Sequence, residues 1–108
     1  MKQQCVAERI WYAVSPEGSG AELALRIGMP HETADMGWAC EVSLGVLEAP
    51  PLTIYGADSW QALQLAMHFV ARRLGYFSKQ GWKFYWAKNE DAVDPDELVR
   101  IPEQGGPL

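Results

Sequence analysis

The chain has 108 residues, 48% hydrophobic and 21% charged, which is the size and composition of one globular domain and excludes intrinsic disorder and long coiled coils. Two cysteines are too few for a disulfide scaffold. No apolar run approaches the length of a membrane span, and charges interrupt the N-terminus where a signal peptide needs an apolar run. We therefore expect a cytoplasmic protein without a membrane anchor.

The net charge of −5 comes from the end of the chain. Residues 1–88 contain eight acidic and eight basic residues, whereas residues 89–108 contain six acidic residues and one basic residue. We therefore expect a single α+β domain over 1–88 and a partly docked acidic tail over 89–108. The tail is interpreted either as a solvated segment that folds back on basic neighbours or as a surface for a basic partner. Nucleic-acid binding is disfavoured, because the acidic tail would repel phosphate.

Four segments in the first half of the chain have the composition or the alternation of strands. They are residues 5–14, 21–27, 38–46 and 52–55. Clusters of glycine, proline and serine separate them, and the segment from Gly28 to Gly37 is predicted as a polar loop.

A long helix is predicted next, because apolar residues recur at helical spacing. These residues are Trp60, Leu63, Met67, Val70, Leu74 and Phe77. Asp58 is placed to cap the helix, Gln61 to complete a capping box, and Gly81 to end it. A last strand is predicted over residues 82–87, and Asp94 precedes a proline as at the start of one short helical turn. We expect Leu98 and Ile101 to dock after that turn.

The order ββββαβ predicts an α+β fold: an antiparallel sheet of about five strands with one long helix packed on one face. The last strand can lie antiparallel beside the first strand or parallel beside the fourth, and we prefer the first arrangement.

A second apolar strip lies about half a turn from the main helical stripe and consists of Leu65, Phe69 and Tyr76. One helix face can contact one sheet, so we predict that this strip is a candidate interaction surface. Either the tail covers it, or a second copy of the chain meets it in a two-fold contact. The tail residues available for this cover are Val93, Leu98, Val99 and Ile101.

Glu8 interrupts the first strand. If Val6, Ile10, Tyr12 and Val14 face the core, the same alternation turns Glu8 inward. A buried carboxylate needs a partner, and Arg72 or Arg73 on the helix would complete a buried ion pair. The alternative is that Glu8 lies at a frayed strand start or that a bulge turns it outward.

Residue types capable of catalysis or metal binding do not converge in the sequence. His31, Glu32 and Asp35 share one loop but lack metal-ligand spacing, so we interpret the loop as solvated. His68 is predicted on the helix surface. We therefore predict no catalytic, metal-binding or cofactor-binding residue.

The two cysteines are not expected to pair. Strands one and three of a meander are separated by about twice 4.8 Å, beyond disulfide reach. Cys5 and Cys40 are instead predicted as small buried residues, with Cys40 an inert thiol.

Four segments carry a resemblance to a known family. They are Gly56-Ala57-Asp58-Ser59-Trp60-Gln61-Ala62-Leu63-Gln64-Leu65-Ala66, Ala7-Glu8-Arg9, Arg26-Ile27-Gly28-Met29-Pro30 and Trp38-Ala39-Cys40. With these motifs, most of residues 5–87 resembles a family of small bacterial α+β domains of unknown function. The resemblance implies no activity.

Immunity proteins, which neutralise toxins, include small α+β proteins of this kind, so the fold suggests an immunity-like role by analogy. Our first hypothesis is a non-enzymatic binding or regulatory module that acts on a protein partner. The alternatives are a structural homodimer through the second helix strip and a small enzyme with a pocket near Glu8.

Overall fold

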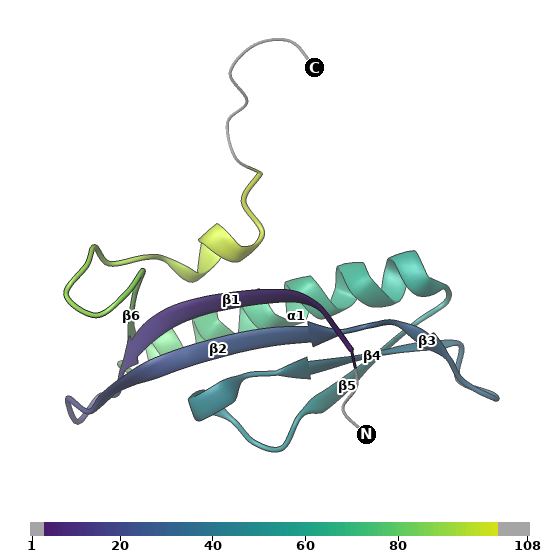
Figure 1. Ribbon diagram of the computed structural model, residues 1–108, viewed down its shortest axis with the longest axis horizontal. Coiled ribbons are helices and arrows are strands. Elements are labelled where there is room, and N and C mark those ends of the chain that lie inside the picture. Colours follow the sequence, from purple (N-terminus) through teal and green to yellow (C-terminus); the bar gives the residue numbers. More distant parts are fainter. Residues whose placement is uncertain (1–3, 102–108) are drawn as a thin grey trace, which may run out of the picture.

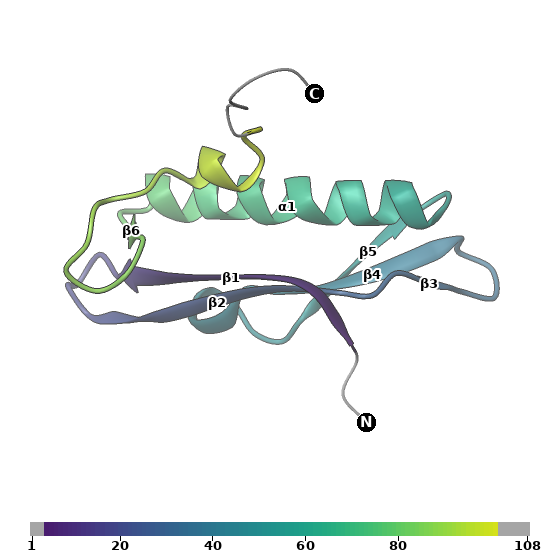
Figure 2. The same ribbon diagram turned by 45° about the horizontal axis from the view of Figure 1, so that its top comes forward.

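An antiparallel sheet carries one long helix on one face in the computed structural model, which describes residues 4–101 (Figure 1). The strands are β1 (Cys5–Val14), β2 (Gly20–Gly28), β3 (His31–Glu32), β4 (Trp38–Ser43), β5 (Leu52–Gly56) and β6 (Lys83–Tyr85). The helices are α1 (Ser59–Lys79) and the 3-10 turns η1 (Gly45–Leu47) and η2 (Pro95–Leu98). The predicted α+β class is confirmed, and α1 forms the second layer above the sheet (Figure 2).

The strand pairing follows the predicted meander. β1 pairs with β2, β2 with β4, and β4 with β5, all antiparallel. β6 pairs antiparallel with the C-terminal end of β1, where Ala13 lies opposite Phe84. The preferred placement of the last strand, beside the first, is therefore confirmed.

Two boundaries differ from the prediction. The polar loop contains the short strand β3, in which His31 pairs with Ala39 of β4. The third predicted strand ends early, because Gly45 adopts a φ of +54° and starts η1. A side chain at Gly45 would come within 2.9 Å of the carbonyl oxygen of Ala24, so only glycine allows this close approach.

The faces of β1 are the reverse of the predicted ones. Trp11 and Ala13 are buried, whereas Val6 and Ile10 are more than a third exposed. The register explains the difference, because Trp11 lies opposite Leu23, which is fully buried beneath the helix. The odd-numbered residues of β1 therefore face α1, and the even-numbered ones face away from it.

The start of α1 confirms the predicted cap by Asp58, while Gln61 reaches one residue further back than the predicted capping box, to Ala57. The Asp58 carboxylate accepts a hydrogen bond from the backbone N–H of Gln61 at 2.8 Å, and Gln61 Oε1 accepts one from the N–H of Ala57 at 2.7 Å. Two otherwise unpaired backbone donors are thereby satisfied.

The buried stripe of α1 is rotated from the predicted one. It consists of Ala62, Ala66, Val70 and Leu74, while Trp60 is 80% exposed and Met67 is 41% exposed. The helix approaches β5 so closely that a side chain at Gly56 would lie 2.5 Å from the backbone nitrogen of Ala62. Small residues at this contact take the core positions that hydropathy assigned to Trp60 and Met67.

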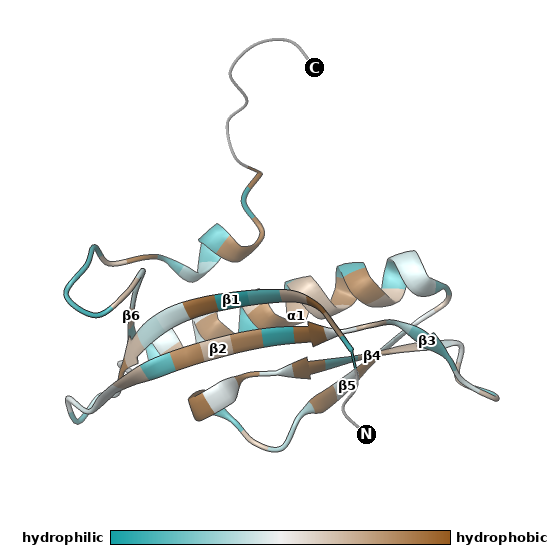
Figure 3. Cartoon of the chain, in the orientation of Figure 1, coloured by the Kyte–Doolittle hydropathy of each residue, from teal (hydrophilic) through white to brown (hydrophobic). Residues whose placement is uncertain are grey.

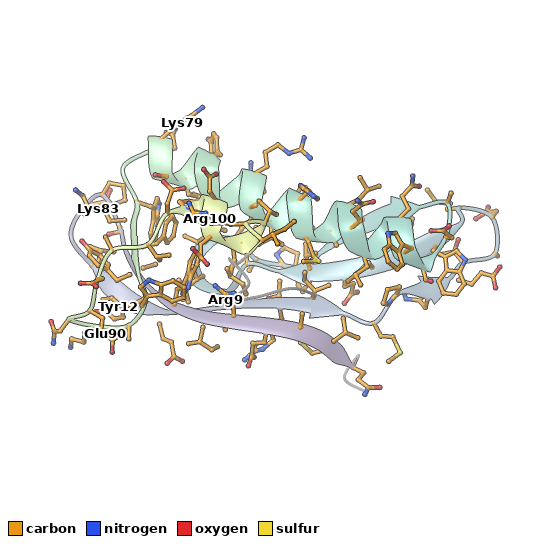
Figure 4. All side chains as sticks on the ribbon, turned by 90° about the horizontal axis from the view of Figure 1, so that it is seen from above. Arg9, Tyr12, Lys79, Lys83, Glu90 and Arg100 are labelled. Carbon is orange, nitrogen blue, oxygen red and sulfur yellow. The ribbon has the colours of Figure 1, made fainter. Side chains whose placement is uncertain are left out.

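The described part of the tail lies on the helix. η2 contacts α1 and lies beside it in two views (Figures 2 and 4). The Asp94 carboxylate caps the turn by accepting from the N–H of Asp96 at 2.8 Å, as predicted. Leu98 packs against the core, but Ile101 is 85% exposed, so the predicted docking of Ile101 is wrong.

Candidate functional site

The predicted buried ion pair of Glu8 with Arg72 or Arg73 is wrong. Glu8 lies directly opposite Arg26 of β2, and the Arg26 Nε donates a hydrogen bond to its carboxylate. Both side chains are about half exposed on the face of the sheet that points away from α1. Glu8 therefore points outward, as the alternative held, but it lies within the paired part of β1 and not at a frayed start, and the cause is the reversed alternation of the strand.

Replacing Glu8 with alanine is expected to lower the free energy of unfolding by no more than about 1 kcal/mol, because an exposed ion pair contributes little in water. Urea denaturation of the two proteins measures this difference. A loss of about 3–5 kcal/mol, the value for a broken buried pair, would contradict the exposed position.

The two helix arginines have other surroundings. Arg73 donates two hydrogen bonds to the carboxylate of Glu48, at 2.9 and 3.2 Å, and its guanidinium lies 4.8 Å from the centre of the Tyr76 ring. Arg72 is exposed. The Glu48–Arg73 pair joins the segment after η1 to α1, and no sequence spacing predicted it because 25 residues separate the two.

The predicted strip of Leu65, Phe69 and Tyr76 is not a uniform surface. Leu65 is 40% exposed and Tyr76 is 48% exposed, but Phe69 packs against the hydrophobic core. The prediction that all three point away from the sheet is therefore wrong for Phe69, because the buried stripe is rotated toward its side of the helix.

An apolar groove lies where α1 meets the residue after η2. It has a volume of about 300 Å³ and is lined by Trp60, Leu63, Gln64, Met67, His68 and Val99. We call it the Trp60 groove. The sequence placed Trp60 and Met67 in the core, so the groove was missed. The signal that could have found it was the pair of alanines, Ala62 and Ala66, which repeat at helical spacing on another side of the helix.

A smaller cleft of about 120 Å³ lies between β1, β2, α1 and η2. Its apolar walls are Ala7, Leu25, Ile27, Met67, Val70 and Leu98. Glu8 also borders it, so a pocket near Glu8 is present, but the Glu8 carboxylate is bound to Arg26 on the other face. Arg9 is the charged residue of β1 that shares the cleft's face, because it lies opposite the buried Leu25.

We call this cleft the Arg9 cleft. Figure 3 shows a hydrophilic stretch, in teal, within β1. Figure 4 shows Arg9 in the space between β1 and η2.

The cysteines are both free, and their surroundings differ. Cys40 is buried and its Sγ donates to the carbonyl oxygen of Gly28 at 3.2 Å. Burial raises the pKa of the Cys40 thiol, which disfavours the reactive thiolate and agrees with the predicted inert role. Cys5 is exposed, so its predicted burial is wrong.

The histidines lie at the surface. His68 is exposed on α1, as predicted, and His31 is exposed on β3. Within residues 4–101, no three His, Cys, Asp or Glu side chains come together in a group that could hold a metal ion.

The same described residues include no helix with both the length and the apolar character needed to cross a bilayer.

The element order and the sheet topology define the class of this protein as a small two-layer α+β domain. The chain belongs to the family described as Domain of unknown function (DUF6968), whose model matches residues 7–94. The resemblance to a family of unknown function is therefore confirmed. No curated protein and no solved structure matches the chain.

Proposed function

We propose that this domain is a non-catalytic binding module that holds a protein partner at the Trp60 groove. The observation that carries the proposal is an 80% exposed tryptophan at the edge of an apolar groove. Tryptophan is enriched among the few residues that dominate binding energy in protein interfaces. A partner that inserts an apolar side chain between Trp60 and Met67 would remove both from water, and the burial favours association.

The net charge favours a basic partner. The acidic side chains of η2 lie away from the groove, since Asp94 and Asp96 border a hollow along the C-terminal half of α1 and Glu97 is paired with Arg100. The net charge of −5 would attract a basic partner over a longer distance and speed association at low salt. A module that captures a basic protein in this way fits an immunity-like role, in which binding alone neutralises the partner.

Self-association is the alternative occupant of the helix surface. A homodimer through Leu65, Phe69 and Tyr76 would bury the exposed parts of Leu65 and Tyr76. The packing of Phe69 in the core reduces the apolar area left for such a seam, so we favour the Trp60 groove. A small enzyme built around the cleft near Glu8 is less favoured, because the Glu8 carboxylate is held by Arg26 on the opposite face.

Site-specific photo-crosslinking in the native cell tests the proposal. A photoreactive residue at Gln64 lies in the groove, one at Leu65 lies on the alternative strip, and one at Glu22 lies exposed on β2 as the matched control. We expect Gln64 to crosslink one partner that the other two positions do not capture. That partner, once purified, should bind the purified domain directly.

Two results would contradict the proposal. Equal crosslinking at Gln64 and Glu22 would show that the groove has no preference for a partner. Crosslinking at Leu65 to a second copy of the chain, with none at Gln64, would favour the homodimer.

A further inference from the structure

We propose that the Arg9 cleft binds a small monocarboxylic acid, with its apolar body between the sheet and α1 and its carboxylate on Arg9. The proposal concerns a different site from the Trp60 groove, because Met67 is the one residue that lines both and neither Trp60 nor Val99 lines the Arg9 cleft.

A buried hydrogen-bond donor of a residue that lines the cleft has no acceptor. Arg9 Nη1 is shielded from solvent and has no hydrogen-bond partner among residues 4–101. Buried polar groups in folded proteins nearly always have partners, so this donor points to an acceptor that binds in the cleft. The indole Nε1 of Trp11, whose ring lies against the Arg9 guanidinium, is likewise buried without a partner, but Trp11 does not line the cleft.

Aromatic rings fix the orientation of the guanidinium. The Arg9 Cζ lies 5.7 Å from the centre of the Trp11 ring and 5.6 Å from the centre of the Trp86 ring. These two rings meet edge to face at 5.9 Å. Held against both indoles by cation–π attraction, the guanidinium is pre-organised, and its planar edge of N–H groups matches the two oxygens of a carboxylate.

The charge around the cleft selects a single negative charge. Arg9 is the one basic residue among the described residues that line the cleft, and the neighbouring Glu8 is already paired with Arg26. A phosphate carries more negative charge than one guanidinium neutralises. A carboxylate carries one charge, and its two oxygens match the planar edge of the guanidinium.

The walls and the volume set the size of the ligand's body. Leu25, Ile27, Val70 and Leu98 offer aliphatic contact. The volume of about 120 Å³ is close to that of a dry, apolar protein cavity known to accept benzene, about 150 Å³. An acid with a body of about four to six carbon atoms fits, such as a branched short-chain acid or an aromatic acid.

Titration of the full-length protein with isovalerate and benzoate, followed by NMR, tests the proposal. We expect saturable shifts of the Trp11 indole N–H and of the Leu98 amide. The neutral isosteres isovaleramide and benzamide should bind at least about tenfold more weakly, because they lack the charge that strengthens a hydrogen bond to arginine. Inorganic phosphate should produce no saturable shift at these two groups.

Variants locate the charge that matters. Arg9→Gln should weaken benzoate binding at least about tenfold, and Arg9→Lys should not restore full affinity, because lysine lacks the planar fork. Arg72→Gln removes a charge from an exposed position of α1 that does not line the cleft and should leave the affinity unchanged.

Three results would overturn the proposal. They are no saturable binding of either acid, equal binding of acid and amide, and equal binding by the wild type and Arg9→Gln. Should Arg9→Gln fail to fold, the comparison of acid with amide on the wild-type protein decides the question alone.

Discussion

Replacing Trp11 with alanine is expected to lower the free energy of unfolding by about 3–5 kcal/mol, the range for removing a large aromatic side chain from a core. Trp11 is 1% exposed, and its ring packs against Phe84 and Trp86 at centroid distances of 6.3 and 5.9 Å. It therefore joins β1 to β6 and to the segment that follows β6. Chemical denaturation monitored by far-UV circular dichroism measures the loss.

The matched control is the same substitution at Trp60. Because Trp60 is exposed on the first turn of α1, its replacement by alanine should change the free energy of unfolding by no more than about 0.5 kcal/mol. Similar losses for the two variants would contradict the assignment of Trp11 to the core and of Trp60 to the surface.

Replacing Leu74 with alanine is expected to lower the free energy of unfolding by about 2–5 kcal/mol. Leu74 is fully buried where α1 packs on the sheet, and its removal leaves a cavity that the neighbouring side chains fill only partly. The expected loss is a large share of the free energy of unfolding of a domain this size. Urea melts of the variant and the wild type give the difference.

Leu65→Ala makes the same chemical change on the same helix at an exposed site. Its expected loss is below that of Leu74→Ala, because Leu65 is 40% exposed whereas Leu74 is fully buried, and alanine has a slightly better helix propensity. If Leu65→Ala were the more damaging of the two, the buried face of α1 would be assigned to the wrong side.

Local signals in the sequence predicted most of the fold. The carboxylate of Asp58 and the amide of Gln61 marked the start of α1, and alternation marked β2. The two residues of β3 are too few to show alternation, so the strand was missed within a loop. Its pairing depends on β4, which supplies the hydrogen bonds.

The faces of β1 could not be predicted because both faces carry large apolar residues. Val6 and Ile10 lie on one side and Trp11 on the other, and hydropathy favours the isoleucine. The pairing with β2 decides which face of β1 is buried, since Trp11 lies opposite the buried Leu23. Assigning the wrong face turned Glu8 inward and Arg9 outward, so the charged residue on the cleft side was overlooked.

The Trp60 groove was missed for a similar reason. Helical spacing alone cannot distinguish a stripe that includes Trp60 from one that includes Ala62. The two positions are about half a turn apart, and on this mostly apolar helix each begins a series of apolar residues at helical spacing. The close contact between α1 and Gly56 of β5 favours the small side chain of Ala62. The position of β5 against the helix cannot be predicted from the sequence.

The affinity of the purified domain for the partner captured at Gln64 tests the central claim most directly. We expect Trp60→Ala to weaken binding at least about tenfold, as for a tryptophan that dominates an interface, and Leu65→Ala to leave the affinity unchanged. Isothermal titration calorimetry of the wild type and the two variants gives the three constants. Equal affinity of Trp60→Ala and the wild type, or a loss confined to Leu65→Ala, would contradict the assignment of the binding site to the Trp60 groove.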